Sequence, residues 1–265
     1  MTDFAERYGP WALIAGGSEG VGAAFAHQLA ERGLNLVLLA RKPDALRETA
    51  EAVRAAHPVV VRTLTVDLTG DDMLESIRAV TDDVEIGTLI YNAGAASGPV
   101  ALIDQPSAVA LANIRLNVVG QTLLAQHFAK GMVARGRGAI VLVGSLGAIA
   151  GGKNLAVYCG VKAFTQTFAE ALWAEMQPHG VDALALMIGR TRTPALERTP
   201  LHENTGVPAA EPGDIAAYAL ANLDAGPVLV PPEHQQSFDA MRAMPRKKAV
   251  QIMTRSLEPQ TKDLI

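Results

Sequence analysis

Residues 12–22 read ALIAGGSEGVG, and this stretch decides the fold. Its first four residues are apolar and predict a short, buried strand, Ala12–Ala15. A glycine-rich turn follows and opens a helix: Gly16 permits a sharp bend, Gly20 keeps the backbone free of side chains, and Gly22 lets the helix pack closely on the strand. Unpaired N–H groups at the start of that helix carry partial positive charge. The stretch therefore favours a strand–turn–helix unit that binds a phosphate group.

The remainder of the chain repeats this alternation of short apolar runs and longer helical stretches. Most of the runs are almost wholly apolar, as in strands that helices cover on both faces. The alternation predicts an α/β fold, a doubly wound parallel sheet (Rossmann-like) of about seven strands in a single domain, residues 1–265. The expected strands are Ala12–Ala15, Asn35–Ala40, Val59–Val66, Thr88–Tyr91, Ala139–Gly144, Val181–Ile188 and Val228–Val230. The expected helices are Gly20–Arg32, Asp44–Ala55, Asp71–Val80, Ser107–Arg135, Leu155–Gln177 and Asp214–Leu223.

Composition limits the classes of function. Of the 265 residues, 49% are apolar and 19% are charged, which predicts a packed core rather than disorder. A formal net charge of −4 and the lack of a basic stripe argue against nucleic-acid binding. Cys159 is the single cysteine and the histidines lack ligand spacing, so we expect neither an intrachain disulfide nor a metal site. Without an apolar signal core or a membrane-length apolar run, a cytoplasmic protein with no membrane span is expected.

Tyr158 and Lys162 lie four residues apart in a predicted helix, so their side chains share one face. A phenol has an ordinary pKa of about 10, and a nearby ammonium group favours the phenolate. Ser145 follows the apolar strand Ala139–Gly144, and ligands of a parallel sheet gather at the carboxyl ends of its strands. These residue types are typical of proton transfer to or from a substrate oxygen, with Ser145 as its hydrogen-bonding partner.

Each of these features also has a structural interpretation. A glycine-rich turn can join a strand to a helix with no ligand. A tyrosine and a lysine four apart on a helix are usually a surface or packing pair, and a serine after a strand is usually a cap or turn residue. The order of all three features around one sheet favours the catalytic interpretation.

Over roughly residues 10–232 the chain resembles the short-chain dehydrogenase/reductase family. The resemblance implies that Tyr158 is the general acid/base, that Lys162 holds the nicotinamide ribose and lowers the pKa of the tyrosine, and that Ser145 positions the substrate oxygen. It implies that Asn117 anchors a water molecule of the proton relay; an ordinary polar helix position is the alternative. The matching residues are Gly16, Gly20, Gly22, Asp67, Asn92, Ala93, Gly94, Asn117, Ser145, Tyr158 and Lys162.

The resemblance also implies a nicotinamide dinucleotide at the carboxyl edge of the sheet. Asp67 would contact the adenine, and Asn92 with Gly94 would line the cofactor cleft. As alternatives, Asp67 caps a local turn and Asn92 is a turn residue. The full set of expected cofactor-binding residues is Gly16, Ser18, Glu19, Gly20, Val21, Arg41, Asp67, Leu68, Asn92, Ala93, Gly94, Tyr158, Lys162, Gly189, Thr191 and Thr193.

The chain departs from the family pattern at several positions, none of which removes a reacting group. Ala15 stands where threonine is usual, Tyr91 replaces an asparagine, and Ile188 replaces a proline. A glycine frame that starts at Gly17 resembles the longer, epimerase-like branch of the family. The short branch is expected, because a chain of 265 residues leaves little room for that branch's added substrate domain.

Arg41 follows the second strand, where NAD-specific folds usually place an acid that binds the ribose 2′-hydroxyl. A guanidinium group suits a 2′-phosphate instead, and Ser18 offers a further hydrogen bond. NADP(H) is therefore favoured over NAD(H). The alternative is a solvated arginine with NAD accepted, and Glu19 in the phosphate turn argues against the phosphate.

The residues expected around the substrate are mostly small or apolar. They favour a neutral, fairly apolar ketone or aldehyde, interconverted with a secondary or primary alcohol. The proline-rich segment 189–213 is long for a connection and is expected to form a substrate lid, while residues 232–265 form a C-terminal tail. The two longest helices carry apolar residues on more than one face, which predicts a homodimer or homotetramer; a monomer whose tail covers them is the alternative.

The sequence thus predicts an NADP(H)-preferring oxidoreductase. A lyase or epimerase that uses the same tyrosine is the alternative within enzymes. A non-catalytic dinucleotide sensor is the alternative outside them, and the retained Tyr158, Lys162 and Ser145 argue against it. Net turnover of the cofactor separates a dehydrogenase or reductase from all of these alternatives.

Overall fold

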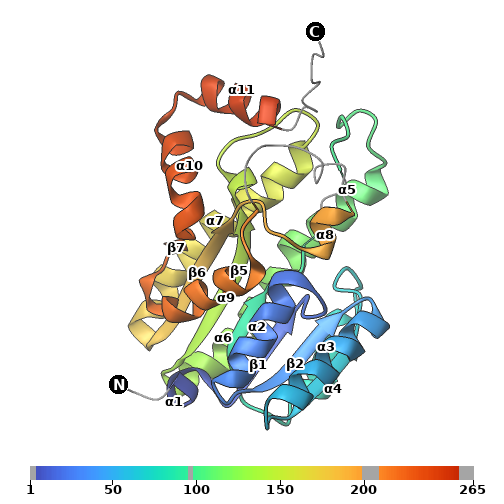
Figure 1. The fold of residues 1–265 in the computed structure, drawn as a ribbon, viewed down its shortest axis with the longest axis vertical. Helices are drawn as coiled ribbons and strands as arrows, with labels where there is room; N and C mark the ends of the chain where they lie inside the picture. The colour runs from blue at the N-terminus through green and yellow to red at the C-terminus, as the bar shows by residue number, and fades with distance from the viewer. Residues whose placement is uncertain (1–3, 95–97, 199–208, 257–265) are drawn as a thin grey trace.

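The structure is a computed structural model, and it describes residues 4–94, 98–198 and 209–256. Its centre is a seven-stranded sheet in the order β3-β2-β1-β4-β5-β6-β7, with every neighbouring pair parallel. The predicted doubly wound, Rossmann-like α/β fold is confirmed (Figure 1). The strands are β1 (Trp11–Ala15), β2 (Asn35–Ala40), β3 (Val61–Thr65), β4 (Ile86–Tyr91), β5 (Gly138–Ser145), β6 (Val181–Ile188) and β7 (Val228–Leu229).

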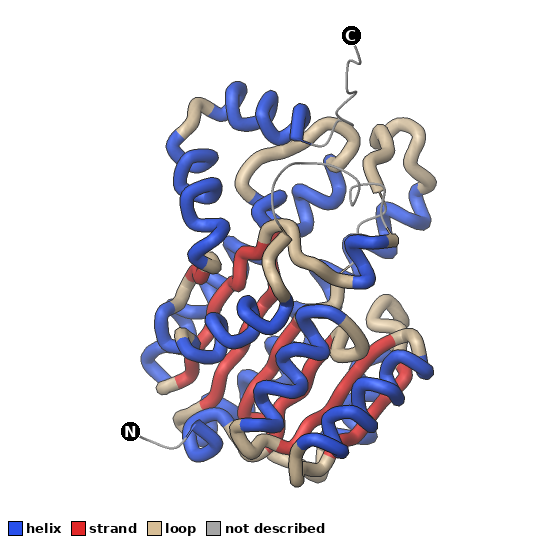
Figure 2. The backbone as a smooth tube through the Cα atoms, in the orientation of Figure 1, coloured by secondary structure: helices blue, strands red, loops and turns tan. Residues whose placement is uncertain are grey.

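Helices cover both faces of the sheet, so the sheet separates two apolar cores (Figure 2). Neighbouring strand residues enter different cores: Ile14 packs in one and Leu13 in the other. Burial on both faces explains why the strands other than β3, at the edge of the sheet, lack an alternation of buried and exposed residues. The first core is covered by α2 (Gly20–Glu31), α3 (Pro43–Ala56) and α9 (Pro212–Ala221), and the second by α4 (Met73–Thr81), α6 (Gln121–Arg135) and α7 (Ala156–Met176). The other helices are α1 (Phe4–Tyr8), α5 (Ser107–Ile114), α8 (Pro194–Glu197), α10 (Pro232–Ala243), α11 (Arg246–Ser256) and short 3₁₀ or π segments.

The strand order reverses at β1, which pairs with β2 on one side and with β4 on the other. Such a reversal leaves a crevice at the carboxyl ends of the strands. Four polar or glycine positions lie at these ends: Gly16 after β1, Asn92 after β4, Ser145 at the end of β5 and Gly189 after β6. The topology therefore brings residues from most of the chain to one edge of the sheet.

The predicted helix Ser107–Arg135 is continuous but not uniform. Between α5 and α6, residues Arg115–Gly120 form a π-helical segment, η1, and Asn117 lies in it. Such segments are frequent at functional sites. The hydroxyl of Tyr91 donates a hydrogen bond to the carbonyl oxygen of Leu116, 2.5 Å away, so this departure from the family pattern ties β4 to η1.

By length and composition alone, the 29 residues Ser107–Arg135 could cross a membrane, and no other described helix meets that test. Core helices of globular proteins meet it as well, and α6 contributes Leu124, Ala125 and Phe128 to the second core. The expectation of no membrane span considered only uninterrupted apolar runs and overlooked this stretch.

The predicted C-terminal tail is helical where the structure describes it. In α10, Phe238 joins the second core and His234 is buried. The next helix, α11, lies against the loop that follows β5. Arg246 donates to a backbone carbonyl of that loop, and the Lys153 N–H donates to Thr254 Oγ1 at 3.1 Å. In the sequence of α10 and α11, charged residues between the inward-facing positions obscure the helical spacing of the apolar residues. Helix α1 was not predicted, and β3 begins two residues later than expected.

Candidate active site

Ser145 and Tyr158 meet at the carboxyl edge of the sheet. The Tyr158 hydroxyl lies 3.2 Å from Ser145 Oγ, and that oxygen also accepts the N–H of Gly147 at 3.1 Å. A β-carbon at Gly147 would lie 3.0 Å from the tyrosine ring, so a larger residue there would press on the ring. The pair that was predicted from sequence is therefore in hydrogen-bonding distance.

Lys162 lies one turn further along α7 and is buried. Its Nζ donates to the carbonyl oxygen of Val143 at 3.1 Å. A β-carbon added to Gly94 would lie 3.1 Å from Lys162 Nζ and 3.2 Å from Asn117 Oδ1, so both groups border the same small space.

Asn117 donates through Nδ2 to the carbonyl oxygen of Asn113 at 3.1 Å, while its Oδ1 is buried without a hydrogen-bond partner among the described residues. Buried acceptors are normally satisfied by protein or by ordered water. An unsatisfied oxygen close to an ammonium group fits a bridging water, which is the role that the family resemblance implies for Asn117.

Burial raises the pKa of Tyr158 above its ordinary value, and the hydrogen bond with Ser145 acts in the opposite direction. The expected lowering by Lys162 is not found in the protein alone, because desolvation dominates and the ammonium group is directed at Val143. Burial also lowers the pKa of Lys162, to about 8. Near neutral pH the tyrosine is thus a protonated phenol, which suits donation of a proton to a substrate oxygen.

The glycine turn has the geometry that a pyrophosphate needs. Gly16 (φ +83°) and Gly20 (φ +57°) adopt backbone angles that side chains disfavour, and a β-carbon at Gly22 would collide with the Gly16 carbonyl. The first turn of α2 has no side-chain cap, so its N–H groups face the crevice edge unpaired by side chains. Asn92 donates from Nδ2 to the Gly16 carbonyl at 2.9 Å and so braces the turn.

Other predicted cofactor residues contribute backbone or local structure. Val21 and Leu68 are buried in the two cores, so they can meet a cofactor only through their backbone. The carbonyl of Ser18 accepts from Thr49 Oγ1 at 2.9 Å. Ala93 follows Asn92 beneath the turn, where its backbone nitrogen would lie 2.9 Å from a β-carbon at Gly16.

Asp67 has the capping role that was considered as the alternative. Its Oδ1 accepts the N–H and the hydroxyl of Thr69, both at 2.9 Å, and the backbone hydrogen bond is the largest cause that lowers the pKa of Asp67. The charge of Arg41 lowers it further, so these two residues lie near one another. Asp67 is exposed, and its contact with the adenine stays a prediction.

Glu19, the residue that argued against a 2′-phosphate, is paired with cations. Arg198, just after α8, forms a bidentate ion pair with its carboxylate, and Lys42 Nζ lies 3.9 Å from it. The first pair joins the predicted lid to the phosphate turn. Residues 199–208 of that lid lie outside the described residues.

The segment after β6 approaches the same turn. Thr191 Oγ1 donates to the Gly189 carbonyl at 3.2 Å, and Thr193 caps α8 by accepting the Leu196 N–H at 3.1 Å. A β-carbon at Gly20 would lie 2.7 Å from the Thr193 methyl group. The predicted residues Gly189, Thr191 and Thr193 therefore lead from the sheet edge to the glycine turn.

One residue of this region was not predicted. The Gly189 N–H donates to Nδ1 of His234, 3.1 Å away on α10. No motif in the sequence links a histidine beyond the last strand to this loop.

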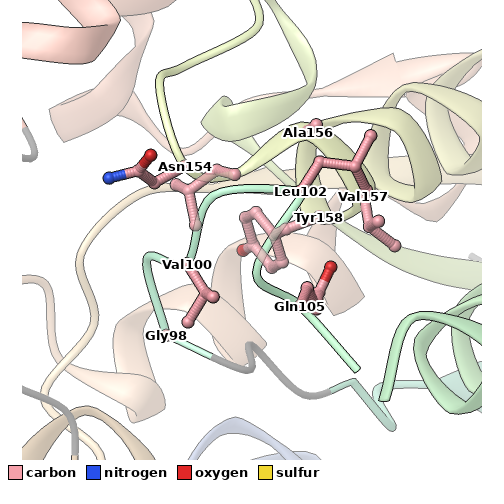
Figure 3. A pocket seen from close by; sticks show the side chains of 9 residues that line it. Gly98, Val100, Leu102, Gln105, Asn154, Ala156, Val157 and Tyr158 are labelled. Atoms are coloured by element: carbon pink, nitrogen blue, oxygen red, sulfur yellow. The ribbon is translucent and has the colours of Figure 1, made fainter. Parts of the chain in front are cut away.

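A pocket opens beside Tyr158 (Figure 3). Figure 3 shows Tyr158, in the first turn of α7, beside the loop that carries Val100 and Leu102. Apolar and polar residues both line the pocket: Gly98, Val100, Leu102, Gln105, Asn154, Leu155, Ala156, Val157 and Tyr158. Residues 95–97, expected near the substrate, lie outside the described part.

Known proteins have sequences similar to that of this chain. Very-long-chain 3-oxoacyl-CoA reductase from Coccidioides immitis is 32% identical over 185 residues, 68% of this chain and 53% of that protein. The chain thus spans about half the length of that relative. 7β-Hydroxysteroid dehydrogenase from Clostridium sardiniense is 31% identical over 223 residues, 83% of this chain and 85% of its own.

Solved structures give the same result. One from work on 7β-hydroxysteroid dehydrogenase stereoselectivity superposes with a TM-score of 0.88 at 27% identity, over 95% of this chain and 99% of that one. A short-chain dehydrogenase from Sphingobium yanoikuyae in complex with NADPH has a TM-score of 0.78 at 33% identity, covering 88% and 92% of the two chains. The sequence profile of the short chain dehydrogenase family matches residues 10–204. With its parallel sheet, glycine turn and Ser145–Tyr158–Lys162 arrangement, the chain belongs to the short-chain dehydrogenase/reductase family.

Proposed function

We propose that the protein is an NADP(H)-preferring oxidoreductase that interconverts a neutral, apolar ketone or aldehyde with the corresponding alcohol. The observation that carries this proposal is the contact of Tyr158 with Ser145, next to the space that Lys162 and Asn117 share at Gly94. A bound nicotinamide dinucleotide supplies or accepts the hydride.

The protein's own residues handle the proton. During reduction, the Tyr158 hydroxyl donates its proton to the carbonyl oxygen of the substrate, and Ser145 hydrogen-bonds the same oxygen. The neutral phenol that burial favours is the form this step requires. Lys162 and Asn117 then return a proton to the phenolate through water in the space beside Gly94.

The preference for NADP(H) is supported by the charges around the end of β2. Arg41 is exposed there, and Lys42 follows it. The negative charge of Glu19 is compensated by Arg198 and Lys42, so it opposes a 2′-phosphate less than the sequence suggested. A guanidinium group binds phosphate in a bidentate manner. The related Sphingobium yanoikuyae structure contains NADPH.

An apolar substrate is supported by the lining of the pocket beside Tyr158. The aliphatic side chains of Val100, Leu102 and Val157 are among its lining residues, beside the polar groups of Gln105, Asn154 and Tyr158. Two relatives are named for a very-long-chain 3-oxoacyl-CoA and a 7β-hydroxysteroid, and a very long acyl chain and a steroid nucleus are both large apolar groups. These names set the first candidates for assay.

A homo-oligomer is supported by apolar side chains that the chain leaves exposed. Leu111 is 58% exposed, Val119 43% and Ile114 38%, along α5 and η1. The stacked rings of Phe164 and Phe168 lie half-buried on α7, which contacts α5. A helix face of this kind usually packs against a partner. Light scattering at several concentrations tests for a dimer or tetramer.

Cofactor turnover tests the proposed activity. A panel of neutral ketones, 3-oxoacyl thioesters and hydroxysteroids is incubated with NADPH or NADH, and absorbance of the reduced nicotinamide is followed. Steady oxidation that Tyr158→Phe lowers by several orders of magnitude is expected. Substrate conversion with no net change in the cofactor would instead indicate the lyase or epimerase alternative. Binding without any conversion would indicate the sensor alternative.

A further inference from the structure

We propose that His234 is a positioning residue for the dinucleotide site. Its imidazole holds the backbone of Gly189 where the segment Gly189–Thr193 can lie against the glycine turn. The inference rests on the proposed function, because it concerns affinity for the dinucleotide. It assigns a role to a residue that lies beyond the last strand of the sheet.

The contact is a hydrogen bond with close steric fit. His234 is 6% exposed and accepts the Gly189 N–H through Nδ1 at 3.1 Å. A β-carbon at Gly189 would lie 2.7 Å from His234 Nε2, so the ring lies directly on the glycine. The residue before it is Ile188, where the family usually has proline, and the fixed backbone angle of proline is therefore missing. The imidazole restrains the backbone at this point instead.

The restrained backbone continues to the phosphate turn. The Gly189 carbonyl accepts from Thr191, which is itself buried, and Thr191 forms a β-bridge with Ala210. Two residues later, the Thr193 side chain lies against Gly20 of the turn. A displacement at Gly189 would therefore shift the segment that borders the phosphate turn. His234 would thus act on the dinucleotide through this segment, without contacting the dinucleotide itself.

The hydrogen bond requires an unprotonated Nδ1, and the surroundings of the ring favour that form. Burial is the main cause that lowers the pKa of His234. The ring also lies in the first turn of α10, where the helix dipole disfavours a positive charge. The negative charge of Glu233 and a backbone contact with Arg190 act in the opposite direction. Protonation at acid pH would replace the acceptor with a donor and release Gly189.

A purely structural role is the alternative, and the chain offers a matched control for it. Phe238 lies one turn further along α10, is 5% exposed and packs in the core. Phe238→Leu weakens the packing of the helix while leaving the Gly189 contact in place. His234→Leu removes the acceptor, and His234→Asn keeps an acceptor, Oδ1, at about the place of Nδ1 without a titratable group.

The test uses the full chain and measures the dissociation constant of NADPH by fluorescence titration, together with melting temperature. We expect His234→Leu to weaken NADPH binding about tenfold, His234→Asn to bind within about twofold of the wild type, and Phe238→Leu to lose stability but not affinity. Between about pH 8 and about pH 5, the wild type should lose more affinity than His234→Asn. The 2′-phosphate of NADPH also titrates in this range, with a pKa of about 6. Because it affects both proteins equally, the difference between their pH profiles reports on His234 alone.

Equal NADPH affinity for His234→Leu and the wild type would overturn the inference, as would parallel pH profiles for the wild type and His234→Asn. If His234→Leu does not fold, the pH profiles alone decide. If the wild type binds no nicotinamide nucleotide, the proposed function is contradicted. If the wild type binds NADPH and the variants bind it equally well, only the role of His234 is contradicted.

Discussion

The Tyr91 hydroxyl and the Leu116 carbonyl oxygen are 2.5 Å apart, and their hydrogen bond joins the end of β4 to the π-helical segment η1. Both groups are buried, and Asn117 is the next residue along the chain. Tyr91 therefore secures the backbone that presents Asn117, the residue proposed to hold the relay water. Burial raises the pKa of its phenol, so it stays a hydrogen-bond donor at any working pH.

Tyr91→Phe is expected to lose both stability and activity. The Leu116 carbonyl would be left buried without this donor, which costs about 1–3 kcal/mol in the free energy of unfolding. The turnover number should fall about tenfold because Asn117 loses its fixed position, with little change in the KM for NADPH. Chemical denaturation and steady-state kinetics measure both, and Tyr218→Phe on α9 is the control. A variant that loses stability while keeping full turnover would show that Tyr91 has no role in the site.

Gly94→Ala tests the shared space between Lys162 and Asn117. The added methyl group would lie 3.1 Å from Lys162 Nζ and 3.2 Å from Asn117 Oδ1, where the relay water is expected. The turnover number should fall about a hundredfold, while the melting temperature changes little. Gly151→Ala is the control, since nothing lies within 4 Å of its added carbon. Equal activity of the two variants would remove the relay from the mechanism.

Much of this site could be predicted from the sequence because its parts are local in sequence or fixed by topology. Tyr158 and Lys162 share a helix face by their spacing alone, and Ser145 reaches them because it ends a central parallel strand. The glycine turn required only the strand before it and the helix after it.

The rest depended on contacts between distant segments. The π turn at Asn117 and the Tyr91 hydrogen bond leave no pattern in the apolar periodicity. His234 and Gly189 are 45 residues apart, and the ion pair of Glu19 with Arg198 spans 179. The direction of the Tyr158 pKa shift also depends on how deeply the folded chain buries the ring, which spacing along a helix does not reveal. The cytoplasmic location stays a prediction.

Lys162→Met is expected to separate stability from function. Burial lowers the pKa of Lys162 from 10.5 to about 8, so below pH 8 the folded state holds a charge that the unfolded chain solvates better. The unfolded state binds more protons between these two pKa values, so this residue's penalty shrinks as pH rises from about 8 to about 10.5. Near neutral pH, the variant should gain about 1–3 kcal/mol in the free energy of unfolding while losing nearly all turnover.

Unfolding curves of both proteins at several pH values measure that difference. The stability advantage of Lys162→Met should be largest below about pH 8 and fade above it. An advantage that stays constant with pH would mean that folding does not shift the pKa of the amine. Wild-type turnover should also decline above about pH 8, as Lys162 loses its proton.

Arg41→Ala addresses cofactor choice. Arg41 is exposed beside Asp67 at the end of β2, and a guanidinium group there would pair with the charge of a 2′-phosphate but cannot accept a hydrogen bond from a 2′-hydroxyl. The variant should raise the KM for NADPH about tenfold or more and leave the KM for NADH within about twofold. Arg47→Ala on α3 is the matched control, because that exposed arginine is paired with Asp44 and Glu51 instead. An equal loss with both cofactors would mean that Arg41 stabilises the strand end rather than recognising the phosphate, and NADP(H) preference would then need another source.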